Sequence, residues 1–114
     1  MAHQQHLQID VRHENDRVVL SITGELDLAS APLLQSAIES TELASAPMVV
    51  LDLQELKFID STGLRVLLAA HERSQARGQD FALTRGSEQV QRLLSITRVA
   101  EHLRIIGSPD ELLV

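Results

Sequence analysis

Hydrophobic and polar positions alternate in the first part of the chain in a way that predicts two paired strands. Residues 7–11 alternate strictly, residues 13–16 are polar and turn-like, and residues 18–23 resume the strand pattern. A period of two places the hydrophobic side chains on one face of a strand. These segments therefore predict an opening hairpin.

The remainder of the chain alternates helical periodicity with short apolar runs. Apolar residues spaced three or four apart indicate an amphipathic helix, and a short run rich in β-branched residues indicates a buried strand. The predicted strands are residues 48–53, 81–84 and 103–106, and the predicted helices are residues 30–42, about 62–77 and a segment that opens at Ser87. Ser108-Pro109-Asp110-Glu111 has the capping-box pattern of a short final helix. The order ββαβαβαβα predicts an α/β fold with a mixed central sheet that carries helices.

Length and composition limit the functions that such a fold can have. The 114 residues are 44% hydrophobic, and we expect one domain over residues 1–114 with a core of about 7–112. Only Phe58 and Phe81 are aromatic, and the 16 acidic residues outnumber the 10 basic ones, for a net charge of −6. Binding of single-stranded nucleic acid needs aromatic stacking faces, and duplex binding needs a basic surface. We therefore expect no nucleic-acid partner.

Cysteine usage and hydropathy indicate a cellular compartment. The chain has no cysteine, which excludes disulfides, thiolate nucleophiles and Cys-based zinc sites. The polar N-terminus lacks the pattern of a secretory signal, and no apolar run approaches the ~20 residues that span a bilayer. We expect a cytoplasmic protein without a membrane partner.

Residue types that carry catalysis do not form a known catalytic pattern in this sequence. The histidines are His3, His6, His13, His71 and His102. No pair among them has metal-chelating spacing, and His71 fits better as a half-buried packing residue. Asp52 fits better as a strand or turn residue than as a catalytic partner of Asp60. A small hydrolase built on Asp27, Asp60 and Ser61 lacks a base tied to the serine. We expect no enzyme activity, no metal and no cofactor.

One segment stands out because it joins an apolar stretch to a predicted helix. In Phe58-Ile59-Asp60-Ser61-Thr62-Gly63-Leu64, Ser61 occupies the expected N-cap position, and Gly63 leaves the backbone open to close approach. A hydroxyl at such a junction is exposed to partners. The plain alternative is that Ser61 is only a cap, worth about 1 kcal/mol.

Two loops taken together resemble the paired signatures of the STAS domain family, specifically the bacterial anti-sigma factor antagonists. The loops are Gly24-Glu25-Leu26-Asp27 and Phe58-Ile59-Asp60-Ser61-Thr62-Gly63-Leu64, and the resemblance extends from about Leu7 to Leu112. It implies the STAS fold over a single domain, and binding to an anti-sigma factor that is also a serine kinase, so that a sigma factor is released. It also implies phosphorylation of Ser61 by that kinase and removal of the phosphate by a serine phosphatase. Thr62 is a secondary candidate for phosphorylation, although a role in packing and hydrogen bonding on the first helical turn fits it better.

The resemblance also implies a partner-binding surface around the acceptor serine. Its expected residues are Glu25, Asp27, Asp60, Ser61, Thr62, Gly63 and Arg65. A phosphoryl group would add roughly −1.5 to −2 charges beside Asp27 and Asp60. We therefore expect phosphorylation to block binding by charge and bulk, with little change of fold.

Two positions depart from the family pattern. Arg65 replaces a frequent second glycine, and such a cation could pair with the phosphate or contact a different partner. Arg98 stands where relatives commonly end a helix with glycine. The alternative function is a STAS subunit docked on a larger assembly, such as a lipid-transport ATPase or a stress-sensing complex. We expect a monomer or weak dimer.

Overall fold

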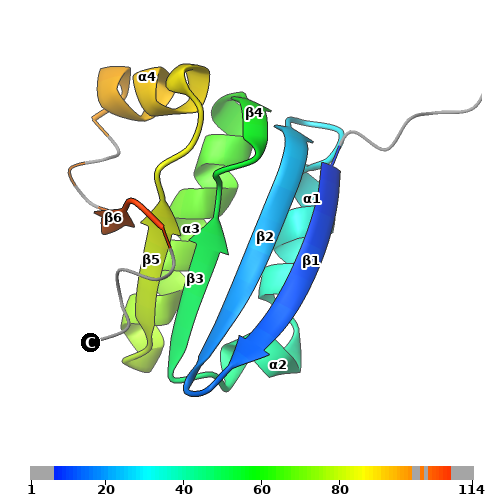
Figure 1. Ribbon diagram of the computed structural model, residues 1–114, viewed down its shortest axis with the longest axis vertical. Coiled ribbons are helices and arrows are strands. Elements are labelled where there is room, and N and C mark those ends of the chain that lie inside the picture. The colour runs from blue at the N-terminus through cyan, green and yellow to red at the C-terminus, as the bar shows by residue number, and fades with distance from the viewer. Residues whose placement is uncertain (1–6, 99–100, 102, 109–114) are drawn as a thin grey trace, which may run out of the picture.

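The computed structural model describes residues 7–98, 101 and 103–108, and a mixed β-sheet forms its centre (Figure 1). The strands are β1 (Leu7–Glu14), β2 (Arg17–Leu26), β3 (Met48–Asp52), β4 (Leu56–Ile59), β5 (Asp80–Thr84) and β6 (Ile105–Ile106). The strand order is β1-β2-β3-β5-β6, with β4 also paired to β2. β1 pairs antiparallel to β2, and the other pairs are parallel. The predicted α/β architecture with a mixed sheet is confirmed.

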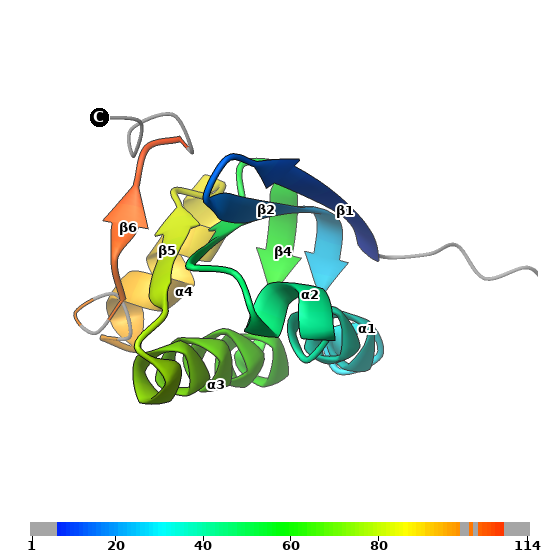
Figure 2. The ribbon, with the colours of Figure 1, turned by 90° about the horizontal axis from the view of Figure 1, so that it is seen from below.

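Helices cover one face of this sheet. They are α1 (Ala31–Ile38), α2 (Thr41–Ala44), α3 (Ser61–Arg77) and α4 (Glu88–Ile96). Figure 2 shows α1, α2 and α3 on the same side of the strands. α4 packs against β4, where the Gln89 side chain accepts a hydrogen bond from the Ile59 amide at 3.2 Å.

The core between sheet and helices consists mainly of aliphatic side chains, with Phe81 as its aromatic member. Its largest fully buried members are Leu7, Leu20, Ile22, Leu26, Leu34, Leu51, Leu53, Leu56, Ile59, Leu67, Leu83 and Leu94. Alternate residues of the strands point to the opposite face. There, Val19, Val50, Ala82 and Ile106 form a second, smaller cluster.

β4 is a strand that the hydrophobic pattern did not predict. β3 pairs with the first half of β2 and β4 with its second half, so the two run one after the other along the same edge of β2. At the break between them, the Asp52 carboxylate accepts hydrogen bonds from the Gln54 amide at 3.1 Å and the Thr84 hydroxyl at 2.9 Å. Asp52 thus fills the strand and turn role expected for it.

The predicted first helix over residues 30–42 is also corrected. α1 ends at Ile38, and a separate short helix, α2, follows. The Ser40 hydroxyl accepts a hydrogen bond from the Leu43 amide at 3.4 Å, and serine used in this way starts a new helix rather than continuing an old one. The predicted final helix falls on Pro109–Glu111, which lie outside the described residues.

The other chain reversals agree with the sequence. β1 and β2 form the opening hairpin through Asn15, whose φ is +54°. Gly78 ends α3 with φ +70°, and the Ser87 hydroxyl caps α4 by accepting from the Val90 amide. Arg98, at the position of a frequent helix-ending glycine, has φ +63°, so it keeps the left-handed turn without glycine.

Gly63 sets how closely α3 approaches the sheet. A Cβ atom there would lie 2.7 Å from Leu26 Cγ, 2.8 Å from Leu26 O and 3.0 Å from Ile59 Cγ1. These distances are shorter than van der Waals contact, so only glycine allows the first turn of α3 to rest on the ends of β2 and β4. The segment before and after Ser61 is fixed by this packing.

We expect Gly63→Ala to lower the free energy of unfolding by about 1–3 kcal/mol, because the added methyl group overpacks this contact. The measurement is urea denaturation followed by circular dichroism. Helix propensity alone would favour alanine by about 1 kcal/mol, and Ala69→Gly on the exposed face of α3 calibrates that effect. A Gly63→Ala protein as stable as the wild type would contradict the packing argument.

Candidate functional site

Ser61 lies where the carboxyl ends of two parallel strands meet. β4 ends at Ile59 and α3 begins at Ser61, while β2 ends beside them at Leu26 (Figure 1). The Asp60 amide donates to the Leu26 carbonyl at 3.1 Å, which joins the two strand ends. Ligands of α/β sheets commonly bind at this edge, and the Ser61 side chain is exposed on it.

The helix cap at this junction is Asp60, and the prediction that Ser61 caps the helix is wrong. Asp60 has extended backbone angles, and its Oδ1 accepts a hydrogen bond from the Gly63 amide at 2.9 Å. Ser61 is already the first helical residue. Among the described residues, its hydroxyl makes no hydrogen bond, so it is available to an external reactant.

The other oxygen of Asp60 ties the helix start to a distant loop. Asp60 Oδ2 accepts a hydrogen bond from the Leu28 amide at 3.0 Å. Leu28 belongs to the connection between β2 and α1, so one carboxylate ties the start of α3 to that connection. Residues 24–27, which the sequence predicts to be a loop, belong to strand β2 up to Leu26. Hydrogen bonds to an ionised acceptor are stronger than neutral ones.

The loop that contains Leu28 is also held by its own side chains. Asp27 Oδ1 accepts from the Ser30 amide at 3.0 Å, and the Asp27 amide donates to Ser30 Oγ at 2.9 Å. The buried Ser30 hydroxyl also lies 2.8 Å from the Glu25 carbonyl oxygen. Asp27 therefore stabilises the loop, and the surface near Ser61 is formed before any partner binds.

The expected partner-binding residues differ in their exposure. Glu25, Ser61 and Arg65 are exposed, Asp27, Asp60 and Thr62 are half-buried, and Gly63 is buried. The structure brings all of them to the edge formed by the ends of β2 and β4 and the start of α3. Gly63 can affect a partner only through the position of its neighbours.

Two exposed hydrophobic residues at this edge were missed by the sequence reasoning. Leu28 is 72% exposed and Phe58 is 39% exposed. Phe58 on β4 pairs in register with Glu25 on β2, so it lies beside the last residues of β2. We name Leu28, Phe58 and Ser61 together the Ser61 surface. The signal was available, because Leu28 falls in a polar loop and Phe58 is one of only two aromatic residues.

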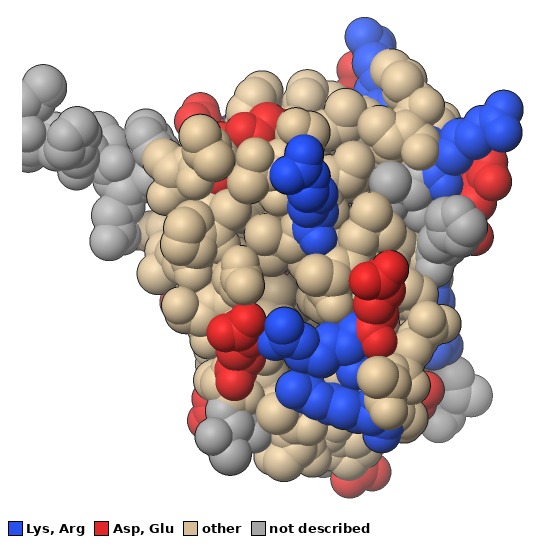
Figure 3. Space-filling view, turned by 180° about the vertical axis from the view of Figure 1, so that it is seen from behind, with Lys and Arg blue, Asp and Glu red and all other residues tan. Residues whose placement is uncertain are grey.

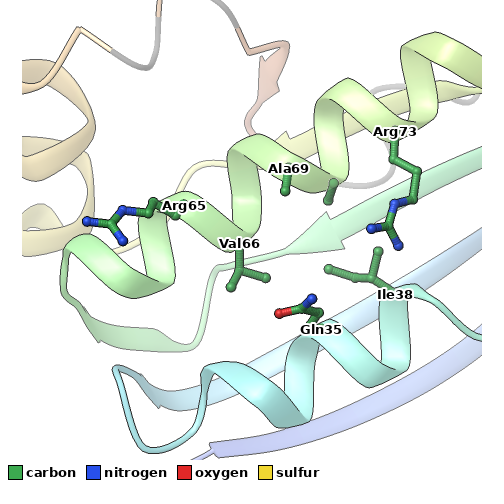
Figure 4. A pocket seen from close by; sticks show the side chains of 7 residues that line it. Gln35, Ile38, Arg65, Val66, Ala69 and Arg73 are labelled. Atoms are coloured by element: carbon green, nitrogen blue, oxygen red, sulfur yellow. The ribbon is translucent and has the colours of Figure 1, made fainter.

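A groove between α1 and α3 adjoins this surface (Figure 4). Its volume is about 100 Å³, and its lining includes Gln35, Ile38, Arg65, Val66, Ala69 and Arg73. Arg73 lies 3.2 Å from the Glu39 carboxylate. Hydrogen bonds from Gln35 and from Arg73 lower the pKa of Glu39, so this end of the groove is charge-paired.

The histidines and acidic residues form no metal-binding group within the part of the chain that the structure describes. His71 is half-buried, with its ring centroid 5.9 Å from that of Phe81, which agrees with its expected packing role. His3, His6 and His102 lie outside the described residues. No helix among the described residues is long and apolar enough to cross a membrane.

Comparison with known proteins decides the family. The sequence model of the STAS domain matches residues 8–112. The chain belongs to the STAS domain family. This STAS domain is 27% identical over 107 residues to the anti-sigma-B factor antagonist of Listeria monocytogenes, an alignment that covers 93% of this chain and 94% of the relative.

Solved structures agree with this assignment. An anti-sigma factor antagonist from Mycobacterium paratuberculosis superposes on this STAS domain with a TM-score of 0.85 and 26% identity, over 94% of this chain and 91% of that one. The phosphorylated form of the Bacillus cell fate determinant SpoIIAA shares the fold, with a TM-score of 0.69 and 17% identity, over 94% and 96% of the two chains.

We expect Asp60→Ala to lower the free energy of unfolding by about 1–2 kcal/mol, because both the cap and the bond to the Leu28 amide are lost. Asp60→Asn keeps one acceptor oxygen and should cost less. Urea denaturation measures the stability, and hydrogen exchange at the Leu28 amide reports the loop directly.

The control for this experiment is Ser61→Ala, which removes no hydrogen bond seen in the structure. It should change the free energy of unfolding by less than about 0.5 kcal/mol. If Ser61→Ala destabilised the protein as much as Asp60→Ala, Ser61 would be the cap after all.

Proposed function

We propose that this STAS domain is an anti-sigma factor antagonist that is switched off by phosphorylation of Ser61. In its unmodified form it binds an anti-sigma factor with serine kinase activity, so that a sigma factor is released. A serine phosphatase restores the binding form. The protein acts by binding, not as an enzyme, and works in the cytoplasm. The observation that carries the proposal is the exposed Ser61 hydroxyl, which makes no hydrogen bond to any residue that the structure describes, at a junction fixed by Asp60.

The position of Ser61 suits a phosphoryl acceptor better than a catalytic nucleophile. In the transfer, the Ser61 oxygen bonds to the γ-phosphorus of ATP, the bond from that phosphorus to the β–γ bridging oxygen breaks, ADP leaves with that oxygen, and the hydroxyl proton passes to a base. No histidine is hydrogen-bonded to this hydroxyl in the described part of the chain. In this proposal the kinase supplies the base and the magnesium ion. Thr62 is half-buried, which fits a packing role on the first turn better than that of a secondary acceptor.

Helix geometry explains why the modification would leave the fold intact. The first turn of a helix carries partial positive charge and tolerates an anion. Both oxygens of Asp60 already accept hydrogen bonds from backbone amides, so the cap does not have to rearrange. The solved phosphorylated form of SpoIIAA supports the view that this fold accommodates a phosphoryl group.

The Ser61 surface explains why the same modification would block binding. Leu28 and Phe58 offer apolar area of the kind that becomes fully desolvated at the centre of an interface. A phosphoryl group between a partner and these residues would have to lose its water shell, at a large cost in free energy. Binding and phosphorylation would therefore exclude each other.

Affinity purification from the bacterium that encodes the protein tests this function. Tagged wild-type protein, Ser61→Ala and Ser61→Asp would be purified in parallel, and the bound proteins quantified by mass spectrometry. We expect an anti-sigma factor kinase with the wild type and with Ser61→Ala, and at least about tenfold less with Ser61→Asp, a loss of about 1.4 kcal/mol or more in binding.

Ser36→Asp is the matched control, because it adds the same charge at an exposed serine of α1 and should leave recovery unchanged. Phosphopeptide analysis of the wild type should place the phosphate on Ser61. Equal recovery with Ser61→Asp would contradict the proposed switch. Recovery of a transport ATPase instead would favour the docked-subunit alternative.

A further inference from the structure

Arg65, on the first turns of α3, has no carboxylate partner among the residues that the structure describes. The ion pairs among the described residues involve Arg12, Arg17, Arg73 and His13, and none involves Arg65. The Arg65 side chain is exposed. No ion pair within the described structure therefore neutralises the charge of Arg65.

Arg73, on the same helix, differs from Arg65 in having a carboxylate partner in the groove. Arg73 turns into the groove and pairs with Glu39 at 3.2 Å, whereas the Arg65 guanidinium points the other way, toward the start of α3 (Figure 4). Side chains of a helix lean toward its N-terminus, so this direction is the natural one. Figure 3 shows the molecule from behind the view of Figure 1. In the lower half of that face, basic and acidic side chains lie next to one another, whereas the basic side chain at the centre of the upper half is surrounded mainly by uncharged residues.

Arg65 is also one helical turn after Ser61. Residues i and i+4 are neighbours on a helix surface, with Cβ atoms about 5–6 Å apart. A guanidinium binds the oxygens of a phosphate through two parallel N–H donors. Among the described residues, neither Asp27 nor Asp60 forms an ion pair with Arg65; both accept hydrogen bonds from amide groups of their own loops or of the neighbouring loop.

We propose that Arg65 binds the phosphoryl group of phosphorylated Ser61 within the same chain. The inference rests on the proposed phosphorylation and adds a second effect to it. In the unmodified protein the guanidinium is open to a partner's acidic group, and in the modified protein it is held by the phosphate. Phosphorylation therefore adds an anion to the Ser61 surface and at the same time makes the neighbouring Arg65 cation unavailable to a partner.

The test uses full-length protein with phosphoserine incorporated at position 61 during translation, so that no kinase is needed. The second ionisation of the phosphate, with a usual pKa of about 6, is followed by ³¹P NMR. A guanidinium partner favours the dianion, so the wild-type pKa should lie below that of Arg65→Ala by about half a unit at low salt. Arg65→Lys, which keeps the charge but loses the paired donors, should fall between them.

Two control variants distinguish a direct contact between Arg65 and the phosphate from the general electrostatic effect of removing any positive charge. Arg77→Ala removes the same charge from the far end of α3, about 24 Å from Ser61 along the helix axis. Lys57→Ala removes the exposed cation of β4. Both should titrate like the wild type. The inference is overturned if Arg65→Ala titrates like the wild type, or if either control variant shifts the pKa as much as Arg65→Ala does.

This test does not depend on whether Ser61 is the natural acceptor. A phosphate pKa that is lower in the wild type than in Arg65→Ala supports the Arg65 contact even if no phosphate is found on Ser61 in cells. That second result would refute only the proposed function. Conversely, phosphorylation in cells together with an unshifted pKa would refute only the role of Arg65.

Discussion

The carboxylate of Asp60 accepts one hydrogen bond from the first turn of α3 and another from the connection between β2 and α1. Because both bonds end on the same ionised group, the two loops that form the candidate site cannot move independently without losing one of them. The direct packing of Gly63 on Leu26 and Ile59 fixes the same junction from beneath. Ser61 is left as an exposed hydroxyl on a rigid support.

A rigid support favours a switch that acts through surface charge. A conformational switch needs an element with two arrangements of similar free energy, and the described contacts at this junction all favour one arrangement. The Asp27–Ser30 bonds hold the loop, and Asp60 holds the loop to the helix. A modification of Ser61 therefore changes mainly what a partner meets: new negative charge, added bulk and, with Arg65, a cation that is no longer available.

The sequence predicts the order of the main elements because their hydrophobic periods are long and regular. It misses β4 because Leu56–Ile59 is only four residues long and shows no regular alternation, and pairing with β2 decides the strand instead. Adjacent Asp60 and Ser61 are equally good caps by residue type, so only the backbone angles distinguish them. Leu28 stands out in the sequence as an apolar residue in a polar loop, but its place beside Ser61 follows from the hydrogen bond between its amide and Asp60, which joins positions far apart in the chain.

The central claim is that phosphorylation of Ser61 changes a docking surface and leaves the fold as it is. The most direct measurement compares ¹H–¹⁵N NMR spectra of the protein with and without phosphoserine at position 61. The account predicts shifts confined to residues 25–30, to β4 and to the first two turns of α3, with β3, β5 and the far end of α3 unchanged. Shifts spread through β3 and β5 would contradict it, because they would show that the modification is transmitted through the core.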